Sequence, residues 1–140
     1  MTLRRRAREV AFRVAYQAES AGDSFALAWT ARQEEEKLND DQRELVADVV
    51  AMLESRGSEV DDALRGAAER WPLERLAATD RAVLRVALAE VMARPGTPVR
   101  VIIDEAIDVA RTFGSAESGR FVNGVLSAVA AEVRPDVGPG

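Results

Sequence analysis

Apolar residues recur at steps of three and four along most of the chain, which is the spacing that places side chains on one face of a helix. In residues 4–18 this stripe is formed by Ala7, Val10, Ala11, Val14 and Ala18. No stretch keeps the alternation of apolar and polar residues that marks a strand. The pattern predicts an all-α protein, a single compact domain of six or seven helices in two sub-bundles over residues 1–134, followed by a flexible tail at 135–140.

Turn and capping residues divide the first half of the chain into segments. Ser24 or Asp23 is suited to cap a second helix, and Asn39 to begin a third. Gly57-Ser58 is expected to end the third helix and to begin a fourth. Trp71-Pro72 closes this half, because proline cannot continue a helix interior.

The second half begins with one short turn, expected at residues 73–76. Thr79 is suited to cap a fifth helix, and Thr97 followed by Pro98 is a typical start of a sixth. Gly114 is expected to end that helix in the left-handed conformation. Ser115 then begins the last helix.

The predicted fifth helix is apolar over most of its circumference. Its apolar residues are Val83, Leu84, Val86, Ala87, Leu88 and Val91. A helix of this kind usually forms the buried centre of a bundle. No apolar run approaches the roughly 18 residues that a membrane-spanning helix needs, so no membrane partner is expected.

The net charge of −5 argues at first against a nucleic-acid partner. The charge is unevenly distributed, however. Residues 1–13 hold five arginines against a single glutamate, whereas residues 34–62 hold an acidic surplus. One end of an acidic chain is therefore basic, and a local basic surface can bind phosphate even when the sum is negative.

The first predicted helix carries arginines and aromatic rings on the side opposite its apolar stripe. At about 100° per residue, that side holds Arg5, Arg8, Phe12, Arg13 and Tyr16. Arginines attract phosphate and rings stack on unpaired bases, which favours single-stranded RNA over duplex DNA. The alternative is that Phe12 and Tyr16 pack on a neighbouring helix and that the arginines are only solvated.

A small, polar segment at residues 114–124 opens the last helix, where unpaired amides form a potential anion site. Gly119 and Gly124 lie inside that helix, where each costs about 1 kcal/mol relative to alanine, so close approach of another group is expected. A crossing helix is the favoured explanation. Glu117 argues against phosphate there, but it could accept from a base amino group or orient an arginine.

The sequence offers little for catalysis. It contains no Cys and no His, which removes disulfides, thiolate chemistry and the commonest general base and metal ligand. It also lacks a glycine-rich phosphate loop and a nucleophile elbow. Asp104, Glu105 and Asp108 are expected on the solvated face of their helix. We therefore expect no enzyme activity, no cofactor and no metal site.

Four segments resemble the NusB family in their order and spacing. They are residues 4–9 with 15–17, residues 80–87, residues 98–106 and residues 121–126, which read RRRARE with AYQ, DRAVLRVA, PVRVIIDEA and FVNGVL. The resemblance extends from residue 4 to about residue 133. Between residues 20 and 70 only the apolar pattern matches, so residues facing a protein partner cannot be assigned there.

The resemblance implies an all-helical fold of two sub-bundles and the function of a transcription antitermination factor. Members of the family bind boxA RNA together with NusE, a ribosomal protein of the small subunit. The complex helps RNA polymerase read through terminators, notably in ribosomal RNA operons. The expected RNA-binding residues are Arg4, Arg5, Arg6, Arg8, Tyr16, Asp80, Glu117, Arg120 and Phe121. Relatives often carry Asp at the position of Glu117.

Two alternatives accompany this interpretation. The same kind of domain occurs fused to RNA cytosine methyltransferases, in which case this chain would be only the RNA-binding part. A homodimeric helical protein–protein adaptor would instead hide the basic face between two copies. A cytoplasmic location fits all three interpretations.

Overall fold

The computed structural model describes residues 3–134, so the predicted tail at 135–140 lies outside the described residues. These residues form six α-helices, one 3-10 helix and no strand, which confirms the all-α prediction. The elements are α1 (Leu3–Ala21), α2 (Phe25–Arg32), α3 (Asp40–Ala67), η1 (Leu73–Arg75), α4 (Ala78–Ala93), α5 (Val99–Phe113) and α6 (Ala116–Val133).

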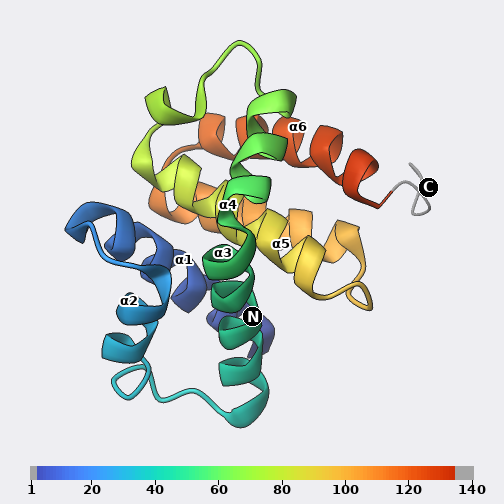
Figure 1. Cartoon of the computed structure of the whole chain (residues 1–140). Coiled ribbons are helices and arrows are strands. Elements are labelled where there is room, and N and C mark those ends of the chain that lie inside the picture. The colour runs from blue at the N-terminus through green and yellow to red at the C-terminus, as the bar shows by residue number, and fades with distance from the viewer. Residues whose placement is uncertain (1–2, 135–140) are drawn as a thin grey trace.

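The helices form two groups that share α3 (Figure 1). The first half of α3 lies with α1 and α2, and its second half reaches α4 and α6. The chain folds back between α4, α5 and α6, so the starts of α4 and α6 and the end of α5 lie at one end of the molecule (Figure 1). The C-terminal half of α1 lies toward the same end.

The break predicted at Gly57-Ser58 occurs one residue earlier, and it is a kink within α3 instead of the end of a helix. The helix continues through these residues and is interrupted only at Arg56, whose φ of −131° and ψ of 29° are not helical. Just before this point the Ser55 hydroxyl donates a hydrogen bond of 2.7 Å to the Ala51 carbonyl, an interaction that tends to bend helices. The expected break is therefore a kink in one long helix.

Three of the expected caps are confirmed. The side chains of Ser24 and Ser115 accept hydrogen bonds from backbone amides in the first turns of α2 and α6. Asn39 forms a reciprocal capping box with Gln42 at the start of α3. Polar side chains therefore satisfy amides that each of these helix starts would otherwise leave unpaired.

Three other boundary predictions are wrong in detail. The caps of α4 and α5 are Ala77 and Pro98, not Thr79 and Thr97. Gly114 does end α5, but its φ of −123° is not left-handed. Steric crowding is the reason for glycine at this position. An added Cβ would lie 2.8 Å from the Ala110 carbonyl oxygen and 2.6 Å from the Ser118 hydroxyl.

Helix α4 is the centre of the core, as its apolar sequence predicted. It contacts α1, α3, α5 and α6, and Leu84 and Leu88 on it have no exposed surface. The buried side chains of all six α-helices form a single cluster. Among residues 3–134 no helix is both long and apolar enough to cross a membrane.

Truncating Leu84 to alanine should therefore destabilise the protein. We expect Leu84→Ala to lower the free energy of unfolding by about 2–5 kcal/mol, because it leaves a cavity among four packed helices. Chemical denaturation followed by circular dichroism measures this loss. Leu27→Ala, which removes an exposed leucine of α2, is the matched control and should change the stability little. Equal stability of the two variants would place α4 at the periphery.

Candidate nucleic-acid interface

Aromatic rings gather where α1 crosses the end of α5. The rings of Phe12 and Phe113 are stacked with centroids 4.8 Å apart, and Tyr16 lies 6.1 Å from Phe12. The guanidinium of Arg13 lies 5.3 Å from the centre of the Phe113 ring, within the range of a cation–π contact. Helix α6 begins three residues after Phe113, so this cluster adjoins the start of α6.

The two aromatic residues of α1 differ in exposure. Tyr16 is 40% exposed, whereas Phe12 is buried against α4 and α5. The expectation that Phe12 lies on the open side of α1 is wrong, and the packing alternative holds for this ring. Tyr16 and Arg13 remain on the surface and can reach a ligand.

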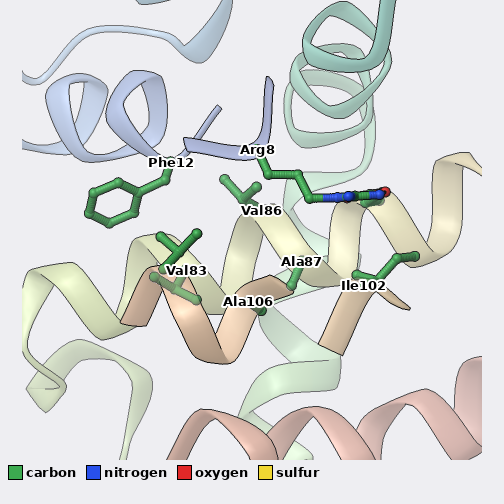
Figure 2. Close-up of a pocket in the computed structure, with 9 residues that line it drawn as sticks. Arg8, Phe12, Val83, Val86, Ala87, Ile102 and Ala106 are labelled. Atoms are coloured by element: carbon green, nitrogen blue, oxygen red, sulfur yellow. The ribbon is translucent and has the colours of Figure 1, made fainter. Parts of the chain in front are cut away.

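Arg8 is also buried, contrary to the expectation that it is solvent-exposed (Figure 2). Its guanidinium donates hydrogen bonds of 2.6 and 2.8 Å to both carboxylate oxygens of Glu90 in α4, and one of 3.1 Å to Glu105 in α5. Burial lowers the pKa of Arg8, but the hydrogen bonds and charges of the two carboxylates outweigh it and raise the pKa above the usual value. Arg8 therefore stays charged and joins three helices.

Arg5 extends this cluster toward the surface. Its guanidinium lies 3.3 Å from Glu105, 3.1 Å from Asp108 and 3.3 Å from Glu9. Glu105 consequently faces α1, so the expectation that it belongs to a solvated face is wrong. Asp108 is exposed on that face, as expected, although it also contacts Arg5.

Arg4 and Arg6 are exposed, but each still has a partner in the chain. Arg4 lies 3.3 Å from Asp41 in α3. Arg6 donates a hydrogen bond of 2.9 Å to the Glu36 carbonyl and lies 3.5 Å from its carboxylate. Exposed ion pairs of this kind contribute about 0–1 kcal/mol, so a phosphate could displace them at little cost.

The glycines of α6 have different surroundings. A Cβ on Gly119 would lie 2.9 Å from the side chain of Arg111 in α5, which confirms the expected close approach, made by a side chain of the neighbouring helix. Gly124 has no atom within 4 Å of such a Cβ, so the expectation of a close neighbour is wrong there. Its outer side is open.

Three predicted residues share the outer side of α6. Glu117 and Arg120 are exposed and Phe121 is half-buried. Arg120 and Phe121 line an open groove together with Gly124 and with residues 66–71 at and after the end of α3; we call it the α3–α6 groove. Sequence reasoning missed this second wall because residues 66–71 carry no motif.

The structure does not bring Tyr16 and Phe121 into contact. No ring contact between them occurs among the described residues, although both lie at the end of the molecule where α6 begins. Asp80 is half-buried in the first turn of α4, and its Oδ1 is a buried oxygen without a hydrogen-bond partner in the described part of the chain. The neighbouring Arg81 pairs with Glu19 of α1 at 2.5 Å.

The cavity beside Arg8 and Phe12 is too small for a small-molecule ligand, and residues 3–134 hold no cluster suited to a metal ion. The cavity beside Arg8 and Phe12 in Figure 2 holds only about 20 Å³, space for about one water molecule. Within residues 3–134 no group of three or more Asp or Glu side chains could hold a metal ion. The exposed arginines and rings are therefore the chemical features that could bind a ligand.

Comparison with known sequences points to one family. A model of the NusB family matches residues 5–131. The transcription antitermination protein NusB of Koribacter versatilis is 39% identical over 134 residues, which cover 93% of this chain and 90% of that protein. The protein of the same name from Sorangium cellulosum is 38% identical over 130 residues, which cover 93% of each chain.

Solved structures agree with this similarity. NusB of T. maritima superposes with a TM-score of 0.86 at 32% identity, covering 97% of this chain and 96% of that one. A structure of the antitermination factors NusB and NusE in complex with double-stranded RNA gives a TM-score of 0.84 at 25% identity, covering 94% of this chain and 98% of that one.

The burial of Arg8 predicts a structural role for this residue. We expect Arg8→Met to lower the free energy of unfolding by about 3–5 kcal/mol, because Glu90 is left buried without its partner. Urea denaturation measures the effect. Arg4→Met is the matched control, since it removes an exposed ion pair and should cost under about 1 kcal/mol.

A second variant tests the cause of this loss. Arg8→Met combined with Glu90→Leu removes both buried charges and should recover much of the lost stability. A double variant as unstable as Arg8→Met alone would contradict the explanation by an unpaired buried charge.

Proposed function

Because this chain belongs to the NusB family, we propose that it is a transcription antitermination factor that binds boxA RNA as a heterodimer with NusE. In this role it joins the antitermination complex of RNA polymerase in the cytoplasm and supports transcription of ribosomal RNA. The names of the relatives support the regulatory function. The similar structure of NusB and NusE with RNA supports the two partners.

One structural observation carries the proposal for RNA. Exposed cations and exposed or partly exposed rings gather at the end of the molecule where α6 begins: Arg13 and Tyr16 on α1, and Arg120 and Phe121 on α6. Neither arginine has an ion-pair partner among the described residues. Rings beside uncompensated arginines suit unpaired bases joined by phosphates.

The N-terminal arginines divide into two roles under this proposal. Arg4 and Arg6 are exposed. On RNA binding, their ion pairs with Asp41 and Glu36 are replaced by contacts with RNA phosphates. Arg5 and Arg8 hold α1 on α4 and α5, so they act on RNA by positioning α1. Glu117 and Asp80 have carboxylate oxygens that can accept hydrogen bonds from base amino groups.

The net charge of −5 supports a role for a second protein in RNA binding. Few arginines face the RNA, and the acidic remainder of the surface repels it. We therefore propose that RNA binding is weak for this chain alone and is strengthened by NusE. A protein partner adds contacts to the same RNA and raises the affinity by linkage.

The alternatives lead to different experiments. As the RNA-binding part of a cytosine methyltransferase, the chain would bind RNA without NusE. As a homodimeric adaptor, it would elute at twice its mass and bind no RNA. The relatives named above are matched over nine-tenths of their own length and are called antitermination proteins. This favours an antitermination factor, which is not an enzyme, over both alternatives.

Titration of labelled boxA RNA at two salt concentrations tests the proposed function. With four phosphate contacts to a single strand, one from each of the exposed arginines named above, we expect the affinity to fall about 50-fold between 50 and 200 mM salt. Adding NusE should tighten binding at both concentrations. Size-exclusion chromatography of the same samples measures the oligomeric state. Affinity that does not change with salt, or with NusE, would overturn the proposal.

Truncating Tyr16 should affect RNA binding more than stability. We expect Tyr16→Ala to lose about 1–3 kcal/mol of RNA affinity, because the exposed ring no longer stacks on a base. Phe12→Ala, one turn earlier, is the matched control and should lose about 3–5 kcal/mol of stability instead. Phe121→Ala is expected to lower both quantities, since its ring is half-buried. Unaltered RNA affinity of Tyr16→Ala would remove the stacking role.

A further inference from the structure

The α3–α6 groove has an exposed tryptophan on its second wall. Trp71 is 58% exposed, whereas Trp29, the other tryptophan of the chain, is only 8% exposed. Tryptophan is usually well covered in folded proteins, and a large exposed ring beside a groove often marks a binding surface. Phe121 contributes a second, half-buried ring to the same groove from α6.

Two arginines line the groove without carboxylate partners. Arg70 and Arg120 are exposed and form no ion pair or hydrogen bond with the described residues. Ten other arginines of the described chain are instead paired with acidic residues. The paired ones are Arg4, Arg5, Arg6, Arg8, Arg32, Arg56, Arg65, Arg81, Arg85 and Arg94. The groove therefore offers positive charge that the protein itself does not neutralise.

The groove also has room for a flat ring close to the backbone. Gly66 and Gly124 line it, and neither has an atom within 4 Å of the position a Cβ would take. Glu69 lies on the same wall as Trp71, and its two carboxylate oxygens are hydrogen-bond acceptors. These acceptors would repel a phosphate placed beside them, but they can accept hydrogen bonds from the amino groups on the edge of an unpaired base.

We propose that the α3–α6 groove binds an unpaired nucleotide of single-stranded RNA. Trp71 and Phe121 provide the ring contacts to the base. Arg70 and Arg120 contact the phosphates on either side of it, and Glu69 accepts from its edge. The inference rests on the proposed function and extends the path of the RNA from the start of α6 to the end of α3.

The test uses the full chain with a labelled single-stranded RNA of 20 nucleotides that contains boxA in its centre, in the presence of NusE. Trp71→Ala should weaken binding roughly 5- to 150-fold, the range for loss of one stacked base. Trp71→Phe keeps a ring and should retain most of the affinity. Adding RNA should quench the tryptophan fluorescence of the parent, and Trp71→Phe should abolish this quenching because Trp29 is buried.

The arginines are tested by the salt dependence of binding. Arg70→Gln combined with Arg120→Gln removes two phosphate contacts, so the slope of log affinity against log salt should become about 1.4 units shallower. Arg100→Gln is the matched control. Arg100 is an exposed arginine at the start of α5, the opposite end of that helix from Phe113, and it has no ion-pair or hydrogen-bond partner among the described residues. Its substitution should leave the slope close to that of the parent.

The outcomes separate this inference from the proposed function. If the parent binds the RNA and Tyr16→Ala weakens it, but Trp71→Ala and the double arginine variant bind as the parent does, the groove is not an RNA site while the proposed function stands. If Trp71→Ala weakens NusE binding in the absence of RNA and leaves RNA affinity unchanged, the groove is a protein-docking site and the inference is wrong. If the parent binds no RNA with or without NusE, both proposals fail.

Discussion

The guanidinium of Arg8 lies between the carboxylates of Glu90 and Glu105, where it joins α1 to α4 and α5 in a site nearly closed to solvent. A buried charge without a partner costs several kcal/mol, so a rotation or translation of α1 that broke these contacts would be strongly unfavourable. The cluster therefore fixes the register of α1. Every exposed side chain of α1 then has a defined place relative to the start of α6.

This register explains which residues of α1 reach solvent. Arg8, Phe12 and Tyr16 follow one another at steps of four, and each step turns about 40° beyond a full helical turn. Arg8 is therefore buried at its ion pair with Glu90, and Phe12 is buried at its ring contact with Phe113. Tyr16, one step later, lies on the surface. The same rigid helix thus combines a structural anchor with an exposed ring two turns later.

The sequence predicted most of the fold because the fold depends on local signals. Apolar spacing located the helices and placed α4 at the centre, and Ser24, Asn39 and Ser115 act as the caps that their side chains suggest. The burial of Arg8 could not be read in this way. Its partners lie 82 and 97 residues away, and an amphipathic pattern assigns any arginine to the solvated side.

The candidate site was predicted in part. The resemblance supplied the residues, and the structure shows that Tyr16, Arg120 and Glu117 are accessible. It does not test their contact with RNA, which stays a prediction. Trp71 received no functional role from the sequence, since its exposure depends on the path of the chain between α3 and η1 and not on its neighbours in sequence.

The kink at Arg56 leaves α3 as a single element that belongs to both groups of helices. Each group packs against part of α3. If one group unfolds, it disrupts the helix on which the other group depends. The molecule should therefore unfold as one cooperative unit in spite of its two-part architecture. For the same reason a partner that binds beside one half of α3 would also stabilise the half at its other end.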